Sequence, residues 1–324
     1  AINGHRGLYV ALPTQATSNA MFDRTMTFLQ GFASASKLDI QLAHGGALLD
    51  QRIVHLRQVD HSAAESLASS AWFGQRKRPL LSPYGVGTID QALFAVLNVK
   101  HHFVRLWGLA NRVVVLDEVH AYDTYTSGLL EALLRWLKSL NCSVILMSAT
   151  LPANRRASFL QAWDAKDRPD IAYPRVLLAT AQGTLGASVA CRTLAPIKVR
   201  GIGEDLDTLA QAALEALAGG GCGAVVVNTV QRAQALYTQL KASLPSDALL
   251  MLFHARFPAD ARSALEQAVV TRFGRDGATR PVKALLIATQ VVEQSLDIDF
   301  DFMLSDLAPV DLLLQRAGRL HRHT

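Results

Sequence analysis

The chain has 324 residues, of which 50% are hydrophobic, and its 32 lysines and arginines against 27 aspartates and glutamates give a formal net charge of +5. This length and apolar content suffice for two domains with separate cores, and the mild positive charge suits an ordinary basic enzyme as well as a protein that binds a polyanion. No apolar run reaches the ~18 residues of a membrane span, the N-terminus lacks the form of a signal peptide, and three cysteines without C-x-x-C spacing indicate neither a zinc site nor a disulfide framework.

In the first half of the chain, apolar runs alternate with helical patterns. We expect strands at 7–12, 38–43, 112–116 and 143–147, and helices at 17–33, 62–72, 89–109 and 125–139. The last helix has the clearest pattern, because Leu129, Leu133 and Leu137 recur with i, i+4 spacing. This β-α-β-α order predicts an α/β fold with a doubly wound, mostly parallel sheet.

The composition changes near residue 165. Residues 164–205 contain several prolines and glycines and no long helical pattern, so we place a first domain at 1–165 and a second at 166–324. In the second domain we expect helices at 206–217, 230–243, 259–273 and 310–319, and strands at 224–227, 249–253, 284–288 and 302–305. Two similar α/β domains in tandem usually bind their ligand in the cleft between them.

Two carboxylates follow directly after a run of β-formers in the segment VVVLDEVHAYD, residues 113–123. A buried parallel strand would deliver Asp117 and Glu118 to its carboxyl end, where open α/β sheets bind ligands. A nucleotide motor needs one carboxylate there for Mg²⁺ and a second to activate the attacking water. The segment LMSATLP, residues 146–152, follows the next strand, at the place where such motors couple nucleotide to track. The alternative is an exposed acidic turn that caps a helix.

The segment QRAGRLHRH, Gln315–His323, carries arginines at 316, 319 and 322. With i, i+3, i+6 spacing, a helix would place these three guanidinium groups on one face, where they repel each other and need an anion. A triphosphate would supply that anion, and an arginine can stabilise charge that develops in phosphoryl transfer. The alternative is a solvated basic helix end that complements the helix dipole, although Gly318 inside the pattern costs helix stability.

Polar side chains also follow several other predicted strands. Thr14 and Gln15 lie in ALPTQATSNAMF, Thr88 lies in GTIDQALF, and Asn228 lies in VVVNTVQRAQ. Hydroxyl, amide and backbone N–H groups at a helix start bind phosphate well, and helix capping is a compatible explanation of the same residues. A further polar stretch leaves a strand at Thr289 and contains Glu293, Ser295 and Asp297; an ordinary loop between strands is the alternative.

These blocks, in this order and together with FHARF and IATQVVEQSLDID, resemble superfamily 2 helicases. They are most similar to the helicase core of type I CRISPR-associated helicase–nucleases, and the resemblance runs from about Leu8 to His323. It implies two tandem RecA-like domains, each a mostly parallel sheet with helices on both faces. The blocks that contain PTQATSNAMF and GTIDQAL favour the CRISPR branch over a general DNA or RNA helicase of the same superfamily.

The resemblance also implies roles, residue by residue. Asp117 would hold Mg²⁺ and Glu118 would be the general base, while His120, Ser148 and Thr150 would couple hydrolysis to movement. The residues implied at the nucleotide in the second domain are Arg319 and Arg322 at the γ-phosphate, Gln315 beside them, and Asp297 and Glu293 nearby. The residues implied on the backbone of single-stranded DNA are Thr14, Gln15, Thr88, Asn228 and Thr289, which would grip phosphates with little sequence preference.

The chain departs from the family pattern at its ends. No G-x-x-x-x-G-K-[ST] phosphate loop occurs, and no His-Asp motif of a nuclease domain occurs. We therefore expect an internal fragment of a longer protein. We also expect the isolated fragment to be only marginally stable, because a first domain without its phosphate-loop strand and helix leaves apolar neighbours uncovered.

The function expected for the parent protein is ATP-dependent translocation on single-stranded DNA in CRISPR interference. The resemblance implies ATP and Mg²⁺ as cofactors, the Cascade surveillance complex as partner, a nuclease domain absent from this chain, no membrane contact, and a prokaryotic cytoplasmic location. Two alternatives remain open: a non-catalytic fragment that binds nucleic acid or Cascade, and a general superfamily 2 helicase.

Overall fold

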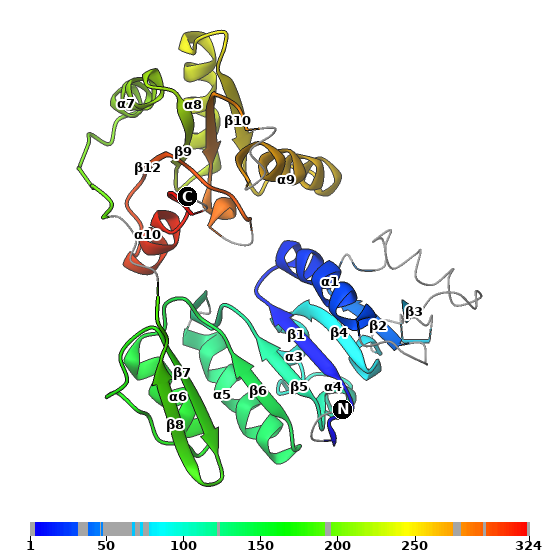
Figure 1. The fold of residues 1–324 in the computed structure, drawn as a ribbon. Helices are drawn as coiled ribbons and strands as arrows, with labels where there is room; N and C mark the ends of the chain where they lie inside the picture. The colour runs from blue at the N-terminus through cyan, green and yellow to red at the C-terminus, as the bar shows by residue number, and fades with distance from the viewer. Residues whose placement is uncertain are drawn as a thin grey trace. The chain divides into compact units, whose positions relative to one another are not determined.

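The computed structural model describes residues 4–31, 38–45, 47, 67–68, 72–73, 78–121, 124–191, 196–274, 280–293 and 296–322. The chain divides into two compact units, Ala1–Thr193 and Leu194–Thr324 (Figure 1). Among the described residues, no helix has both the length and the apolar character needed to cross a membrane.

The division between the units falls later than the boundary placed at residue 165 from composition. An antiparallel hairpin accounts for the difference; its strands are β7, Arg175–Thr180, and β8, Gly183–Ser188. The chain that leads into the hairpin is tied to the first unit by an ion pair of 2.8 Å between Arg156 and Asp167 and by the Tyr173 hydroxyl, which donates to the carbonyl of Ala149 at 2.9 Å. Contacts of this kind cannot be predicted from a change in amino-acid composition along the chain.

The first unit is built on a six-stranded parallel sheet with the order β3-β2-β4-β1-β5-β6. Its strands are β1 Leu8–Leu12, β2 Leu38–Ala43, β3 Leu67–Ala68, β4 Tyr84–Thr88, β5 Val113–Leu116 and β6 Ser143–Leu146. Its helices are α1 Gln15–Gln30, α3 Ile89–Leu93, α4 His102–Leu109, α5 Thr124–Ser139 and α6 Ala153–Ala162, with the 3₁₀ turns η3 Pro79–Leu81 and η4 Val119–Ala121.

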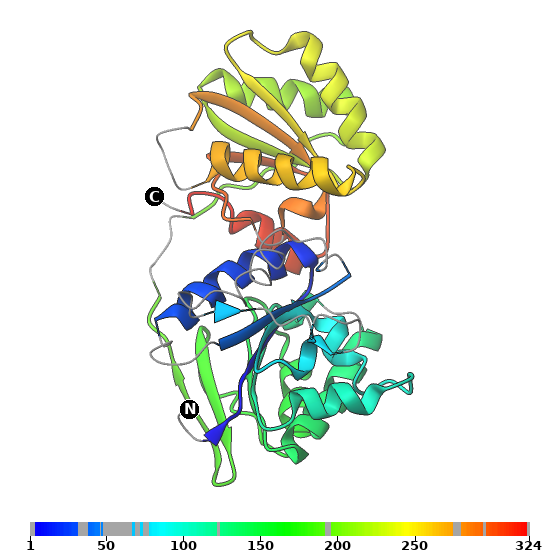
Figure 2. The ribbon, with the colours of Figure 1, turned by 90° about the vertical axis from the view of Figure 1, so that its right-hand side faces the viewer.

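The central strand β1 shows why the strands of this sheet have continuous apolar sequences. Tyr9 and Ala11 belong to a core with α3, α4, α5 and α6, whereas Val10 and Leu12 belong to a second core with α1. Successive side chains of a strand point to opposite faces, so a strand that is covered on both faces is apolar at every position. Helices therefore lie on both faces of the sheet, as Figure 2 shows.

Two expectations for the first unit are corrected. The range 89–109 is not one helix: α3 ends at Leu93, α4 begins at His102, and His101 between them has a left-handed φ of 66°. The helix expected at 62–72 is wrong at Leu67–Ala68, which form β3, and Trp72 lies in a turn. The other residues of that range lie outside the described part of the chain.

The second unit has a four-stranded parallel sheet with the order β10-β11-β9-β12. Its strands are β9 Gly221–Val226, β10 Leu249–Phe253, β11 Lys283–Ala288 and β12 Phe302–Ser305. Its helices are α7 Leu206–Ala218, α8 Val230–Ser243, α9 Ala259–Phe273 and α10 Val310–Ala317, with the 3₁₀ turn η6 Gln290–Val292. One core lies on the α9 side of the sheet and another on the side of α7 and α8. The helix expected at 310–319 ends earlier, because Gly318 is the C-cap of α10.

Candidate nucleotide and DNA site

The two predicted carboxylates lie at the carboxyl end of β5. The Asp117 N–H donates to the carbonyl of Ala11 at 2.9 Å, so the ladder with β1 continues to this residue. Glu118 then adopts a left-handed φ of 52°, and its N–H donates to Asp117 Oδ1 at 2.8 Å. A non-glycine residue in this conformation is uncommon and is often found at functional sites. The strand thus ends in a sharp turn that carries two successive carboxylates.

Burial raises the pKa of Asp117 above its ordinary value. The N–H of Glu118 and the positive charge of His120 act in the opposite direction, and both effects are smaller. A cation beside Asp117 would favour its charged form, so the position suits a metal or a metal-bound substrate more than it suits an isolated carboxylate.

A hydrogen-bond network joins the segment after β5 to the segment after β6. The Nδ1 atom of His120 lies 2.9 Å from Ser148 Oγ and 3.2 Å from Glu118 Oε2. Ser148 Oγ donates to the carbonyl of Thr150 at 3.2 Å. The Val119 N–H also donates to the carbonyl of Met147 at 3.1 Å. These hydrogen bonds couple the two segments, so a movement of one would shift the other.

Arg155, which sequence reasoning did not single out, extends this network: its side chain donates from Nη1 to the carbonyl of His120 at 3.2 Å. The hydroxyl of the predicted residue Thr150 is buried without a hydrogen-bond partner among the described residues. Arg155 lies in α6, directly after the Ser-Ala-Thr turn. Its position a few residues after that turn was the one feature of the sequence that could have indicated a role at this site.

The three polar residues predicted to contact DNA from the first unit follow β1 and β4, which are neighbours in the sheet. Leu12 pairs with Thr88 in the register of these strands, so Thr14, Gln15 and Thr88 lie at the same carboxyl edge as Asp117. Thr14 forms a capping box with Thr17 at the start of α1, which is the capping role considered above. Gln15 is exposed, whereas Thr88 is buried.

The arginine block of the second unit differs from the sequence-based expectation. Arg316 and Glu293 form a buried ion pair of 2.6 Å, and each side chain is only 2% exposed. Arg316 also donates to Ser305 Oγ at 2.7 Å and to the carbonyl of Asp306 at 2.9 Å. The three arginines do not share one helical face, because α10 ends before Arg319. The protein itself supplies the anion that Arg316 needs, and Glu293 is the residue that supplies it.

The two remaining arginines lie beyond the end of α10. Arg319 donates to the carbonyls of Leu296 at 2.6 Å and Glu293 at 3.0 Å. The Arg322 Nε atom lies 3.3 Å from Asp297 Oδ1, and both side chains of this pair are more than 40% exposed. Gln315 is half-buried on α10, between the buried Arg316 and the exposed Leu314. Ser295, expected in the same loop, lies outside the described residues.

The predicted DNA contacts of the second unit lie at the carboxyl ends of β9 and β11. The Asn228 N–H donates to Asp306 Oδ2 at 2.9 Å, and its side-chain amide donates to the carbonyl of Leu307 at 2.8 Å. Thr289 is 2% exposed and its N–H donates to the carbonyl of Phe253 at 3.3 Å. Asp306, directly after β12, was not predicted but also lies at this edge. The indication in the sequence was a polar residue directly after an apolar strand.

His254, at the end of β10, also lies at this edge and was not singled out. Its ring stacks on Phe257 with a centroid distance of 4.2 Å, and the side chain is buried. Burial lowers its pKa, which favours the neutral imidazole. The four strands of this unit thus all end in a polar residue at one edge of the sheet.

Comparison with known proteins identifies the relatives of this chain. A family model described as "CRISPR-associated nuclease/helicase Cas3, C-terminal" matches residues 219–324. The CRISPR-associated endonuclease/helicase Cas3 of Thermus thermophilus is 47% identical over 374 residues, which cover 99% of this chain and 40% of that protein. A crystal structure of T. fusca Cas3 matches with a TM-score of 0.88 at 37% identity, over 99% of this chain and 39% of that one. This chain is related to Cas3.

The relationship extends to other Cas3 proteins. The Escherichia coli K12 Cas3 is 38% identical over 335 residues, which cover 97% of this chain and 37% of that protein. The expected resemblance to CRISPR-associated helicase–nucleases is confirmed, and so is the expected α/β fold with RecA-like sheets. The chain spans about 40% of the length of the Thermus Cas3, so it corresponds to the helicase portion of proteins more than twice as long.

Asp117 in the first unit could serve as one carboxylate ligand of a magnesium ion. Among the described residues no group of three or more histidine, cysteine, aspartate or glutamate side chains could hold a metal. Mg²⁺ in nucleotide motors is usually held by one or two carboxylates together with phosphates and water, so a full protein cage is not required. Asp117, at the end of β5 and with its pKa raised by burial, matches that mode.

Proposed function

We propose that this chain is the helicase core of a longer CRISPR-associated helicase–nuclease that hydrolyses ATP to move along single-stranded DNA. The observation that carries the proposal is the network that joins Glu118, His120 and Ser148 beside Asp117. It links a carboxylate suited to water activation with the segment after the next strand, and a motor needs such a link to convert hydrolysis into movement. The prokaryotic cytoplasm, where such a protein would meet invading DNA, is the proposed location.

Nucleotide binding is supported by the relatives. A crystal structure titled T. fusca Cas3-ATP matches this chain with a TM-score of 0.85 at 38% identity, over 99% of this chain and 39% of that one. We assign Asp117 to Mg²⁺, which would neutralise phosphate charge when bound, and Glu118 to the general base. Ser148, Thr150 and His120 transmit the state of the site to the segment after β6.

In the second unit we assign Arg319 and Arg322 to the γ-phosphate, with Gln315 and Asp297 close by. The Arg322–Asp297 pair is exposed, and exposed ion pairs are worth only about 0–1 kcal/mol, so a phosphate can displace Asp297 at low cost. Arg319 donates to the backbone carbonyls of Leu296 and Glu293, which hold its guanidinium group beside this loop. Glu293 is assigned to form the buried ion pair with Arg316, which fixes the segment after β11 against α10.

The DNA track is assigned to Thr14, Gln15, Thr88, Asn228 and Thr289, which lie at the carboxyl edges of their sheets. Such groups contact phosphate and carry little sequence preference. The proposed partner is the Cascade surveillance complex, and the proposed recipient of the DNA is a nuclease portion of the longer polypeptide. A solved structure titled CRISPR RNA-guided surveillance complex, pre-nicking, supports the partner: its matching chain is 34% identical with a TM-score of 0.69, over 98% of this chain and 40% of that one.

The substitution Glu118→Gln in the intact parent protein tests the proposal. General base catalysis contributes roughly 10²–10⁴-fold, so DNA-stimulated ATP hydrolysis should fall by about that factor. Binding of single-stranded DNA should be unchanged. Glu131→Gln on α5 is the matched control, because the ion pair that Glu131 forms among the described residues is with Arg135, one turn away at 3.6 Å. Undiminished hydrolysis in Glu118→Gln would show that the catalytic assignment is wrong.

One observation favours a second candidate function for the chain by itself. It contains no G-x-x-x-x-G-K-[ST] sequence, so the 324 residues on their own would act as a non-catalytic module that binds DNA or Cascade. ATP hydrolysis by the 324-residue chain that depends on Glu118 would exclude this alternative. Dependence of the parent's anti-phage activity on Cascade would separate the CRISPR assignment from a general helicase.

A further inference from the structure

Two aspartates, Asp301 and Asp306, flank strand β12 at its two ends. At the amino end, the Asp301 N–H donates to the carbonyl of Cys222 at 2.8 Å, and Asp301 Oδ2 accepts from the Cys222 N–H at 2.7 Å. The same carboxylate forms an ion pair of 3.1 Å with Arg280. Asp301 therefore fixes the start of β12 to the neighbouring strand β9, and neither of these partners is assigned to nucleotide or DNA.

Asp306 repeats this pattern at the carboxyl end of β12. Its N–H donates to the carbonyl of Val226 at 2.9 Å, and its Oδ2 atom accepts from the Asn228 N–H at 2.9 Å. Its Oδ1 atom accepts from Arg232 Nε at 3.2 Å. One of these partners, Asn228, is assigned to the DNA track. The two aspartates thus make matched contacts around the same strand, but Asp306 also contacts a residue with a proposed functional role.

The backbone of Asp306 faces the arginine block, Gln315–His323. Its carbonyl accepts from Arg316 Nη1 at 2.9 Å. Arg316 is in turn held by the buried ion pair of 2.6 Å with Glu293, and the carbonyl of Glu293 accepts from Arg319 at 3.0 Å. Asp306 therefore lies between the arginine block and the asparagine assigned to DNA.

Asn228 is held in a defined position by contacts to three of its groups. Asp306 accepts its N–H, the carbonyl of Leu307 accepts from its side-chain amide at 2.8 Å, and Gln290 Nε2 donates to its carbonyl at 3.4 Å. An amide nitrogen carries two hydrogens, so the second hydrogen of Asn228 Nδ2 can donate to a phosphate. The direction of that hydrogen depends on two consecutive residues, Asp306 and Leu307.

The contacts of Asp306 require a carboxylate. Its two oxygens accept from two different donors, the backbone N–H of Asn228 and the Arg232 guanidinium group. The Arg232 Nη2 atom also donates to the carbonyl of Glu204 at 2.6 Å, which fixes the direction of this side chain. An ionised carboxylate has acceptors only, whereas an asparagine side chain has one acceptor oxygen and one donor group. Asp306→Asn would therefore keep the shape of the side chain but turn an NH₂ group toward one of the two donors.

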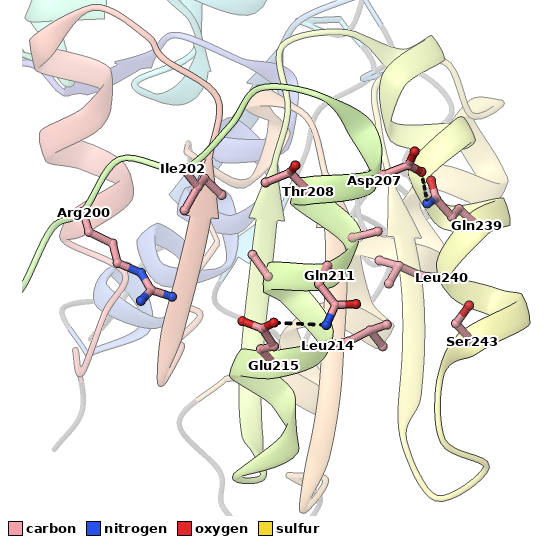
Figure 3. Close-up of a pocket in the computed structure, with 12 residues that line it drawn as sticks. Arg200, Ile202, Asp207, Thr208, Gln211, Leu214, Glu215, Gln239, Leu240 and Ser243 are labelled. Carbon is pink, nitrogen blue, oxygen red and sulfur yellow. Dashed lines mark hydrogen bonds between the residues drawn. The ribbon is translucent and has the colours of Figure 1, made fainter.

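Other carboxylates of the second unit form contacts that involve neither Asn228 nor the arginine block. Figure 3 shows an open pocket beside α7 and α8, where Asp207 accepts from Gln239 Nε2 at 2.7 Å and Glu215 accepts from Gln211 Nε2 at 3.0 Å. None of these four side chains is assigned to nucleotide or DNA. Asp207, which bridges α7 to α8, is therefore a second reference for a hydrogen-bonded carboxylate of this unit.

We propose that Asp306 is a positioning residue that couples the DNA contact of Asn228 to the arginine block. Its carbonyl is bonded to Arg316 and its carboxylate to Asn228, and Asp306 itself touches neither nucleotide nor DNA. The proposal rests on the proposed function above, which assigns Asn228 to the DNA track and the arginine block to the nucleotide. A shift of α10 on nucleotide binding would move Arg316 and Asp306 and so change the strength of the DNA contact.

Binding of single-stranded DNA to the intact parent protein tests the positioning role. In Asp306→Asn, the dissociation constant for a fluorescent oligothymidylate, measured by anisotropy, should rise by about 5-fold or more, as expected when one hydrogen bond is lost. Asp301→Asn makes the same chemical change at the other end of β12, and Asp207→Asn makes it at the pocket. Both should leave the dissociation constant within about 2-fold of its original value. An equal rise in Asp301→Asn and Asp306→Asn would overturn the proposal.

The double substitution of Asn228→Ala with Asp306→Asn shows whether Asp306 acts through Asn228. Asn228→Ala should weaken DNA binding by itself, and adding Asp306→Asn should weaken it by less than about 2-fold further, because the contact is already gone. Additive losses would overturn the proposal. Weaker binding in Asn228→Ala with unchanged binding in Asp306→Asn would overturn the positioning role and leave the DNA track in place. Unchanged binding in Asn228→Ala would refute its assignment to the track, and the positioning role with it.

The nucleotide dependence of DNA binding tests the coupling itself. The ratio of the dissociation constants measured with and without a non-hydrolysable ATP analogue should move toward 1 in Asp306→Asn, and it should change by less than about 2-fold in Asp301→Asn. An unchanged ratio in Asp306→Asn would overturn the coupling. A ratio of 1 in the unsubstituted parent protein would show that nucleotide and DNA are not linked, which would refute the proposed motor function and the coupling with it.

Discussion

The carboxyl edges of the two sheets present charge in different ways. In the first unit, Glu118 has a left-handed φ, its N–H donates to Asp117 Oδ1, and its carboxylate lies 3.2 Å from His120 Nδ1. In the second unit, the most buried arginine is already neutralised by Glu293, with both side chains 2% exposed. Charged residues near the carboxyl edge of a parallel sheet therefore have two different roles in this protein. In the proposed function the carboxylates of the first edge act on a ligand, whereas in the second unit Arg316 is paired with Glu293 inside the protein.

The strongest test of this difference is to break the buried pair of the second unit. Arg316→Met leaves Glu293 buried without its partner, so the free energy of unfolding should fall by about 3–5 kcal/mol, measured by urea denaturation. The double substitution Glu293→Met with Arg316→Met removes both charges and should recover most of the loss. If the double variant stays as unstable as the single one, the stabilising partner of Arg316 is not Glu293.

The contrast between these arginines shows where sequence reasoning reached its limit. The i, i+3, i+6 spacing predicted three equivalent arginines, but a helix that ends at Ala317 gives each a different environment. The strand ends that carry Asp117 and Thr289 were predictable, because apolar runs followed by polar residues mark the edge of a parallel sheet. The network between His120 and Ser148 forms because β5 and β6 are neighbours in the sheet. The sequence indicates that neighbourhood only through the order of the predicted strands and helices.

Strand position gives a second contrast between the units. In the described residues β6 pairs only with β5, and Ile145 on it is 48% exposed, whereas Ile287 on the central strand β11 is fully buried. Ile287→Thr places a hydroxyl in the core and should lower the free energy of unfolding by about 2 kcal/mol. Ile145→Thr in the 324-residue chain should change it by less than about 0.5 kcal/mol.

The same Ile145→Thr substitution in the intact parent protein tests whether another strand covers β6 there. If another strand covers β6 there, the cost should rise toward that of Ile287→Thr. Binding of a hydrophobic dye to the 324-residue chain provides an independent reading, because an uncovered apolar edge should bind dye. A cooperative melt with little dye binding would contradict the expected marginal stability.

The link between the segments after β5 and β6 can be weakened without touching either carboxylate. Ser148→Ala removes the hydroxyl that lies 2.9 Å from His120 Nδ1. A hydrogen bond of this kind is worth about 0.5–1.5 kcal/mol, so strand separation per ATP hydrolysed by the parent should fall by roughly 2–10-fold while ATP hydrolysis changes less. Ser139→Ala on α5 is the control, since its hydroxyl donates within its own helix, to the Arg135 carbonyl at 3.1 Å. Equal losses of both activities would show that Ser148 serves hydrolysis itself.

The smallest expected effect concerns the stability cost of keeping Asp117 available for a ligand. Burial raises its pKa, so the folded state binds the proton more tightly than the unfolded chain, and the contribution of Asp117 to stability is lost as the pH rises through the folded-state pKa. Asp117→Asn keeps an oxygen for the Glu118 N–H and removes the charge. The free energy of unfolding at pH 7 should therefore rise by about 0.5–1 kcal/mol, as is common when a functional group is replaced, and the gain should shrink as the pH falls through that pKa. Asp164→Asn is the control with the opposite sign, because the Lys138 side chain lowers the pKa of Asp164, so its contribution to stability is present at neutral pH and is lost in acid. A loss of stability in Asp117→Asn at pH 7 would mean that this carboxylate, like Glu293, is already used by the fold, and the contrast between the two sheet edges would not hold.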